Sequence, residues 1–307
     1  MLVVLNPRSN AGTALAKWQP VERELRLRHP GLVVETPTDP PAAAELVRGG
    51  LAAGTIVAAG GDGMVNLVLN AIMDPETDRP RSDRVVLGGI GLGSSNDFHK
   101  PMSASIGGVP VRIDAERAAP IDIGKATMLL PDGTRTVRYF LLNASMGLVA
   151  AGNHSFNQAR GAIGWLKSRN VSAAIAATAL WNIATHSPLT LRLHGTDWTH
   201  TAPVTNVGVL KSVHFAGGMR YDTPVTNADG MFDVNIWAAA PRLRILGLIA
   251  GLYRGRFTGS PLATCLRDTA VELRPANPAP LELDGEITIV ESARLQVLPR
   301  ALRVCAA

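Results

Sequence analysis

Short apolar segments alternate with stretches of helical periodicity over the first hundred residues of this 307-residue chain. Between the apolar runs, hydrophobic residues recur every three or four positions, which indicates amphipathic helices. A chain that alternates strands with helices folds into a mainly parallel sheet with helices on its faces. We therefore expect an N-terminal α/β domain with strands at residues 2–5, 32–35, 55–59 and 84–87 and helices at 13–28 and 41–53.

The pattern changes at about residue 121. Two strand-like runs flank residues 131–133, Pro-Asp-Gly, which is a turn sequence typical of a hairpin, and short strand-like runs recur after it. Residues 160–186 and 241–254 have helical character. We predict an α/β domain over residues 1–121, to which the segment at about 291–307 returns, and a largely antiparallel β-sandwich over residues 122–290.

Composition excludes several classes of protein. Two cysteines, Cys265 and Cys305, are too few for a disulfide framework or a cysteine zinc site. No apolar run approaches the length of a membrane-spanning helix, and the apolar start is too short for a signal peptide, so we expect a cytoplasmic protein. Only five of the 30 basic residues are lysines, and the many arginines suit an anionic partner. Basic runs are absent, however, and aromatic residues make up 5% of the chain, which argues against nucleic acid as that partner.

The strongest local signal is the glycine-rich turn Gly60-Gly61-Asp62-Gly63, which joins an expected strand to an expected helix. Glycines let a backbone approach a ligand closely, and the N-terminus of the following helix attracts phosphate. A carboxylate in such a turn would repel phosphate unless it holds magnesium or accepts a proton, which makes Asp62 informative.

Two further polar loops follow expected strands. Residues 91–98 form a second glycine-rich turn, and residues 6–10 follow the first strand. Parallel sheets bind ligands at the carboxyl ends of their strands, so the three loops together predict one site. The chain has neither a P-loop sequence nor a dinucleotide-binding glycine fingerprint.

These motifs resemble the catalytic domain of the diacylglycerol kinase family, which includes bacterial lipid kinases, sphingosine kinases and ceramide kinases. The matching segments appear in the order typical of the family over nearly the whole chain. They lie at residues 6–9, 60–63, 93–98, 122–124, 143–147, 217–219, 229–234 and 284–286.

The resemblance implies an ATP site in a cleft between the two domains, with magnesium as cofactor and transfer of the γ-phosphoryl group to a lipid hydroxyl in phospholipid metabolism. Glu286 is the first candidate for the base that activates the acceptor, and Asp284 and Asp62 remain alternatives. The residues implied to line the nucleotide are Asn6, Pro7, Arg8, Ser9, Asn10, Thr36, Gly60, Gly61, Asp62, Gly63, Met64, Val65, Asn66, Ser94 and Asn96.

The same resemblance implies a structural magnesium ion in a loop of the second domain. Its ligands would be Thr226, Asp229 and Met231, through the Asp229 carboxylate and neighbouring backbone carbonyls, an all-oxygen set that hard cations accept. An ordinary Asp-Gly turn before the strand expected at residues 232–238 is the alternative.

Some positions depart from the family pattern. Met64 stands where threonine is usual, and His99-Lys100 replaces a small residue followed by arginine. Two other functions therefore stay open: a kinase of a soluble alcohol or of NAD, and a nucleotide- or lipid-binding protein without activity.

The segment 242–256 has an apolar middle and four arginines at its ends. Such a helix either packs on the second domain with its arginines in solvent or touches an anionic membrane. A lipid substrate implies transient contact with a membrane, at its inner face for a cytoplasmic protein. The sequence leaves a homodimer open.

Overall fold

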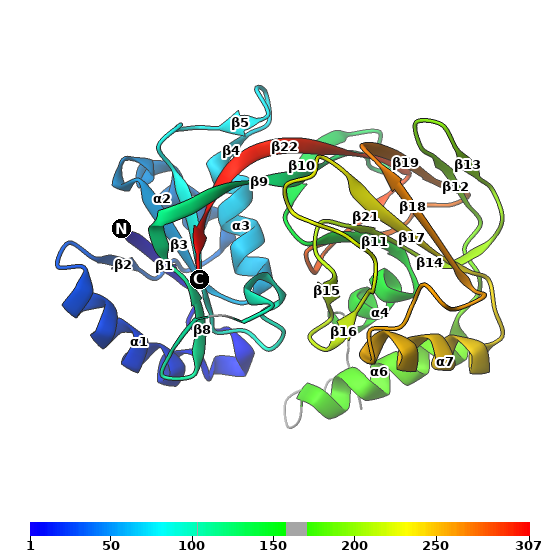
Figure 1. Cartoon of the computed structure of the whole chain (residues 1–307), viewed down its shortest axis with the longest axis horizontal. Helices are drawn as coiled ribbons and strands as arrows, with labels where there is room; N and C mark the ends of the chain where they lie inside the picture. The colour runs from blue at the N-terminus through cyan, green and yellow to red at the C-terminus, as the bar shows by residue number, and fades with distance from the viewer. Residues whose placement is uncertain (103, 158–170) are drawn as a thin grey trace. The chain divides into compact units, whose positions relative to one another are not determined.

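The computed structural model describes residues 1–102, 104–157 and 171–307, and it divides the chain into two compact units (Figure 1). The first unit comprises Met1–Ile123, Asn227–Asp229 and Leu298–Ala307, and the second comprises Gly124–Thr226 and Gly230–Val297. The division falls inside two long strands, β9 (Asp114–Leu129) and β22 (Ser292–Ala306). Of the helix expected at 160–186, residues 160–170 lie outside the described residues.

A parallel sheet forms the centre of the first unit. Its strands run in the order β2-β1-β3-β6, and each neighbouring pair is parallel. The end of β22 continues the sheet in parallel beside β6, where Arg303 pairs with Val86, and a short strand, β8, pairs antiparallel with β6. The bounds are β1 (Leu2–Leu5), β2 (Val33–Glu35), β3 (Thr55–Gly60), β6 (Val86–Gly91) and β8 (Val109–Arg112).

Helices cover this sheet because successive strand residues point to opposite faces. On one face, Trp18, Val21 and Leu25 of α1 (Ala14–Arg28) pack in one cluster with Val3 and Leu5 of β1. Two further helices, α2 (Pro40–Gly49) and α3 (Asp62–Ile72), pack against each other and against the sheet. The start of α2 is capped by Asp39, whose carboxylate accepts a hydrogen bond from the Ala42 N–H at 2.8 Å.

Short elements connect these strands and helices. They include the 3₁₀ turns η1 (Asn10–Gly12), η2 (Leu51–Ala53) and η3 (Asp97–His99) and the hairpins β4–β5 (Met73–Asp74 and Arg79–Pro80) and β7–β8, in which β7 is Ser105–Ile106.

The second unit is a sandwich of two antiparallel sheets, as the sequence predicted. One sheet has the order β18-β17-β14-β11-β20-β21, with every neighbouring pair antiparallel. Its strands are β11 (Asn143–Gly147), β14 (Val204–Leu210), β17 (Phe232–Ala238), β18 (Ala263–Asp268), β20 (Ala279–Leu283) and β21 (Glu286–Val290).

The other sheet of the sandwich joins β13, β12, β19 and the first part of β22, with β9 paired to β22 and β10 paired to β9. Alternate residues of both sheets meet in one apolar core, within which Phe140 stacks on Phe232. The remaining bounds are β10 (Arg135–Phe140), β12 (Leu191–His194), β13 (Thr199–His200) and β19 (Ala270–Pro275).

Three helices contribute to a second apolar cluster in this unit, on the other face of the six-stranded sheet. Trp237 of β17 and Leu210 of β14 pack there with Leu148, Ile183 and Leu248. These last three side chains come from α4 (Leu148–Asn157), α6 (Val171–Thr185) and α7 (Arg242–Tyr253). The sequence predicted α7 and the described part of α6, but it did not predict α4. The small hairpin β15–β16 (His214–Phe215 and Met219–Arg220) completes the cluster.

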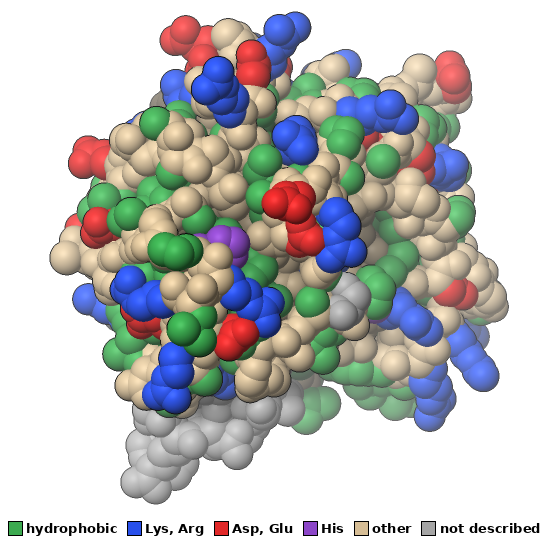
Figure 2. All heavy atoms as spheres, turned by 60° about the vertical axis from the view of Figure 1, so that its left-hand side comes forward, with side chains coloured by type: hydrophobic (Ala, Val, Ile, Leu, Met, Phe, Trp, Pro, Cys, Tyr) green, Lys and Arg blue, Asp and Glu red, His purple; other side chains and the backbone are tan. Residues whose placement is uncertain are grey.

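Charged side chains are dispersed on the face drawn in Figure 2, where Lys and Arg lie singly or in small groups with Asp and Glu between them. Among the described residues, no helix combines the length and the apolar character needed to cross a bilayer.

Candidate functional site

The residues expected to line a nucleotide gather along one edge of the first unit. Thr36 follows β2, Asn6 follows β1, Gly61 follows β3 and Leu92 follows β6. Because these four strands are parallel neighbours, the loops after them all leave the sheet at its carboxyl edge. The structure therefore places the three polar loops and Thr36 in a row.

The first loop is shaped by two asparagines. The Asn6 side chain accepts a hydrogen bond from the Arg8 N–H at 3.0 Å, and the Asn6 N–H donates to the Ala59 carbonyl at 2.9 Å. Asn10 has a positive φ of 51°, which asparagine tolerates well, and its amide donates to the Thr13 hydroxyl at 2.8 Å. Arg8 is exposed between them, where its guanidinium is free to meet a solvent-borne anion.

The two glycine turns touch each other. The Leu92 N–H donates to the Gly60 carbonyl at 2.8 Å, and a Cβ added to Gly93 would lie 2.5 Å from the Gly61 Cα. No side chain fits at that distance, so Gly93 is required for the contact between the two turns. The sequence assigned the glycines to ligand binding, and the structure adds this second, structural reason.

Asp62 and Asn96 hold the second turn in place. The Asp62 carboxylate accepts hydrogen bonds from the N–H groups of Asp97 at 3.1 Å and Phe98 at 3.0 Å. Asn96, at a φ of 51°, exchanges two hydrogen bonds with the backbone of Gly93 at 2.9 and 3.1 Å. Burial, with a further contribution from the charge of Asp97, raises the pKa of the Asp62 carboxyl, although the two backbone hydrogen bonds oppose the shift.

Helix α3 presents its N-terminus at this edge. Gly61 is the residue before the helix, and the helix itself offers no acceptor to the N–H groups of its first residues, Asp62 and Gly63. The side chains of Met64, Val65 and Asn66, which were expected near the nucleotide, are buried. The N–H groups of Met64 and Val65 donate to the Gly61 carbonyl at 2.9 and 3.3 Å, so they do not point at a ligand either. Ser94 and Thr36, in contrast, are exposed.

The candidate bases of the second unit differ sharply in environment. Asp284 is only 5% exposed, and its carboxylate accepts hydrogen bonds from the N–H groups of Leu141 at 2.7 Å, Leu142 at 2.8 Å and Asn143 at 3.1 Å. It therefore ties the start of β11 to the turn between β20 and β21. Glu286, the first residue of β21, is exposed.

A second buried carboxylate, Glu282, was not singled out from the sequence. It lies beside Ser145 in the register of β20 and β11, is 6% exposed, and accepts a hydrogen bond from the Ser145 hydroxyl at 2.8 Å. The sequence does show the alternation of a strand here, because Leu281 and Leu283 face the core and Glu282 lies between them. Alternation alone would have placed Glu282 in solvent, but α4 packs against β20 and Glu282 is buried.

His99 is buried next to the second glycine turn. It is 4% exposed, its ring packs edge-on against Phe98, and neither ring nitrogen has a hydrogen-bond partner among the described residues. Gly89 of β6 makes room for it, since a Cβ there would lie 3.0 Å from the His99 Nε2 atom and 2.7 Å from the Phe98 ring. Burial, with the nearby charge of Arg112, lowers the pKa of His99 to about 4.

The loop expected to hold a structural magnesium ion has a protein cation beside it. The buried Lys211 ammonium donates a hydrogen bond to the Met231 carbonyl at 2.8 Å. A positive charge at that distance from a proposed ligand opposes a divalent ion, so this donor set does not fit a structural magnesium site well. Thr226 and Asp229 are exposed, and the part of the chain that the structure describes contains no cluster of three acidic, histidine or cysteine side chains arranged for a metal.

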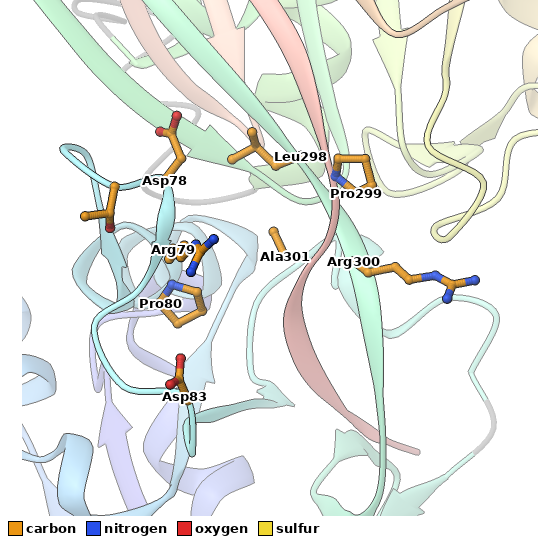
Figure 3. A pocket seen from close by; sticks show the side chains of 9 residues that line it. Asp78, Arg79, Pro80, Asp83, Leu298, Pro299, Arg300 and Ala301 are labelled. Atoms are coloured by element: carbon orange, nitrogen blue, oxygen red, sulfur yellow. The ribbon is translucent and has the colours of Figure 1, made fainter.

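An open hollow of about 390 Å³ lies elsewhere in the first unit, between the β4–β5 hairpin and residues 298–301 (Figure 3). Arg79 and Ala301 lie on opposite walls, while the Arg300 side chain extends away from the others. The hairpin follows the C-terminal end of α3, whereas the glycine turns adjoin its N-terminal end. An eleven-residue helix is about 16 Å long, so this hollow is separate from the strand-end edge.

Comparison with known families identifies both units. Residues 1–126 match the diacylglycerol kinase catalytic domain, and residues 145–306 match the domain described as "YegS C-terminal NAD kinase beta sandwich-like domain". The chain belongs to the diacylglycerol kinase catalytic-domain family. The resemblance seen in the ordered motifs is thereby confirmed, and the chain is a phosphotransferase whose acceptor is an alcohol group.

Relatives within the family carry lipid kinase names. The chain is 26% identical over 265 residues to a protein of Pectobacterium atrosepticum named "Probable lipid kinase YegS-like". The matched region covers 82% of this chain and 78% of that protein. The chain is 28% identical over 277 residues to a protein of the same name from Pseudomonas savastanoi, with coverage of 85% and 79%.

Solved structures share the fold of this family member. A putative diacylglycerol kinase from Bacillus anthracis superimposes with a TM-score of 0.69 at 18% identity, over 100% of this chain and 96% of that one. Yeast NADH kinase in complex with NADH superimposes with a TM-score of 0.51 at 8% identity, over 100% and 83%.

Proposed function

We propose that this protein transfers the γ-phosphoryl group of ATP to a hydroxyl of a diacylglycerol-like or sphingoid-like lipid. The observation that carries the proposal is the carboxyl edge of the parallel sheet, where two touching glycine turns and the N-terminus of α3 meet. Backbone N–H groups and a helix dipole at such an edge suit phosphate oxygens. Exposed Arg8 adds a guanidinium on the adjacent loop.

Hydrogen bonds within the protein hold the loops of this edge in place. Asn10 and Asn96 fix the loops in which they lie through side-chain hydrogen bonds, Asp62 holds the second glycine turn, and the Leu92 N–H joins the two turns. Phosphoryl transfer depends mainly on positioning and on stabilising charge. Holding the phosphate-binding loops in position is therefore the protein's principal contribution. Magnesium bound with the nucleotide would offset the phosphate charge, and Asp62 is the carboxylate at the edge that would contact it.

Glu286 is proposed as the base that takes the proton from the acceptor hydroxyl. An attacking lipid hydroxyl must reach the carboxylate, and Glu286 is exposed while Asp284 is buried and holds three backbone N–H groups. Asp62 remains the alternative, since its raised pKa suits proton transfer, but both of its oxygens already accept backbone hydrogen bonds.

The relatives named lipid kinases favour a lipid acceptor over a soluble one. A kinase acting on NAD is the second candidate, because yeast NADH kinase shares the fold. We further propose that the protein works in the cytoplasm and reaches its substrate by transient contact with the inner face of the membrane.

A substrate panel tests these proposals directly. Purified protein is incubated with labelled ATP, magnesium and, in separate reactions, diacylglycerol, sphingosine, ceramide and NAD. Label in one of the three lipids is the expected result. Label in NAD alone would replace the proposed function with the second candidate, and bound ATP without transfer to any acceptor would indicate a binding protein.

A further inference from the structure

Helix α7 carries two apolar stripes, and only one of them is buried. The buried stripe, Ile245, Leu248 and Leu252, packs into the cluster over the six-stranded sheet. An α-helix turns about 100° per residue, so residues at positions 243, 246, 250 and 253 form a second stripe on the other side. That stripe consists of Leu243, Leu246, Ala250 and Tyr253, all exposed, with Leu243 at 82%.

Helix α6 lies beside α7 and also exposes apolar side chains (Figure 1). Leu180 is 60% exposed and Trp181 is 62% exposed, while Ile183 on the other side of the helix is buried. Ala184 is exposed one turn further along. We refer to Leu180, Trp181, Ala184 and the exposed stripe of α7 as the α6–α7 surface.

The charges nearest α7 are mainly positive, with one carboxylate just beyond its C-terminal end, where exposed Asp222 accepts hydrogen bonds from the Phe257 and Thr258 N–H groups at 2.9 Å. Arg242 and Arg244 are exposed at the start of α7, and Arg254 and Arg256 are exposed just beyond its end. The sequence contains no Asp or Glu from residue 234 to residue 267, nor from 171 to 196. The α6–α7 surface is therefore apolar in the middle and positive at both ends of α7.

A helix that is apolar on both sides normally has partners on both sides. Trp and Tyr at the margin of an apolar face, with arginines around it, are typical of segments that enter the boundary between lipid headgroups and acyl chains. A second copy of the chain is a poorer occupant. Antiparallel pairing of two α7 helices would bring Arg242 and Arg244 of each copy beside Arg254 and Arg256 of the other, with no carboxylate on α7 to compensate.

We propose that the α6–α7 surface docks the protein on an anionic lipid bilayer, with its apolar side chains in the headgroup boundary and its arginines on the phosphates. The inference rests on the proposed lipid kinase function for its biological purpose, because a lipid acceptor resides in a membrane. The binding itself is tested without catalysis, so that the two proposals can fail independently.

The test is sedimentation of the full chain with vesicles of phosphatidylcholine alone and with vesicles containing phosphatidylglycerol, in the absence of ATP. The unaltered protein is expected to bind the anionic vesicles and to dissociate as salt is raised. Trp181→Ser combined with Leu243→Ser, and separately Arg242→Gln combined with Arg244→Gln, should each weaken binding by about tenfold or more.

Matched controls lie in the first unit. Leu27→Ser replaces an apolar side chain that is 75% exposed, and Arg23→Gln combined with Arg84→Gln removes two exposed arginines outside the α6–α7 surface. These variants should bind vesicles like the unaltered protein. The melting temperature should agree within about 1 °C for all variants, which shows that they are folded and that the effect concerns docking.

Three results would overturn the proposal. One is equal vesicle binding by the Trp181→Ser, Leu243→Ser variant and the unaltered protein. Another is no binding of the unaltered protein to either vesicle. The third is sedimentation equilibrium showing a dimer that this variant dissociates, which would assign the surface to a second copy. Vesicle binding that responds as expected, in a protein that phosphorylates no lipid, would keep the docking surface and reject the proposed function.

Discussion

Asp62 in the first unit and Asp284 in the second were both candidates for the catalytic base. In the structure both carboxylates accept backbone hydrogen bonds that hold another segment of the chain in place. Asp62 accepts two backbone hydrogen bonds from the second glycine turn and remains partly exposed. Asp284 accepts three from consecutive residues and is nearly inaccessible. The acidic residues of a motif can thus hold a distant segment of backbone in place rather than take part in the reaction.

The two carboxylates differ in their access to solvent: Asp284 is buried, whereas Asp62 is partly exposed. Asp284 is surrounded by protein, so its carboxylate contributes to the stability of the second unit. Asp62 stands at the strand-end edge, where it both orders a loop and offers negative charge to a cation or a proton. A structural carboxylate and a carboxylate near the chemistry should therefore respond differently to substitution.

The largest effect is expected for Asp284→Ala. The substitution leaves three buried N–H groups without an acceptor, which should reduce the free energy of unfolding by about 4 kcal/mol or more. Asp284→Asn keeps one acceptor oxygen and should recover roughly half of the loss. Calorimetry of the whole chain measures both. A melting temperature unchanged by the alanine variant would show that the three hydrogen bonds are not what holds the turn.

Glu286→Gln should have the opposite profile. Turnover should fall by about a thousandfold, because glutamine cannot accept the proton, while the melting temperature stays within about 1 °C and ATP affinity within a few-fold. Glu291→Gln, at another exposed position shortly after β21, is the control and should be fully active. Turnover retained in Glu286→Gln would reject Glu286 as the base.

His99 extends the comparison to a buried side chain whose ring nitrogens lack a hydrogen-bond partner among the described residues. The unfolded chain binds a proton at this residue below about pH 6.5, whereas the folded protein does so only near pH 4. Stability should therefore be greatest above pH 6.5 and decrease as the pH falls through this window, by up to about 3 kcal/mol in total.

Denaturant titrations at several pH values, compared with His99→Leu, isolate this contribution, because other acid-sensitive groups are common to both proteins. The difference between the two proteins should change between pH 6.5 and 4 and be constant outside that range. Parallel pH profiles would mean that His99 is not protonated differently in the two states.

A smaller effect is expected for Asp62→Asn. The amide keeps one acceptor for the loop and loses the other, which should cost about 1–2 kcal/mol and raise the KM for ATP several-fold. If Asp62 were the base instead, kcat would collapse with little change in KM or stability. The ratio of the two kinetic effects distinguishes a positioning role from a catalytic one.

The smallest effect concerns magnesium at the proposed ligands Thr226, Asp229 and Met231. Because the Lys211 ammonium already bonds to the Met231 carbonyl, the melting temperature of the nucleotide-free protein should change by less than about 1 °C between excess magnesium and EDTA. Lys211→Asn removes the cation and should create a magnesium-dependent gain. A marked loss of stability of the unaltered protein in EDTA would restore the loop around Asp229 as a structural metal site.

Much of the fold follows from local pattern. The strand–turn–helix at Gly60, the hairpin around residue 132 and helix α7 were all predictable, because each depends on spacing within a few residues. Helix α4 and strands β20 and β21 were not. Their short segments carry weak periodicity, and contacts with distant strands decide their conformation.

The site divides in the same way. The strand-end loops could be located from the sequence, because parallel strands must end at one edge. The assignment of the carboxylates could not. Nothing within the motif at residues 284–286 shows that Asp284 accepts N–H groups from residues more than 140 positions away while Glu286 faces solvent.

The sequence by itself determined the family, the order of the two domains and the loops that form the proposed nucleotide site, because these depend on residue type and short spacing. The tertiary structure alone decided which side chains are buried: Glu282 beneath helices, His99 beside a strand glycine, and one apolar stripe of α7 but not the other. A side chain is buried by residues that are distant in the sequence, and the pattern of neighbouring residues does not identify them.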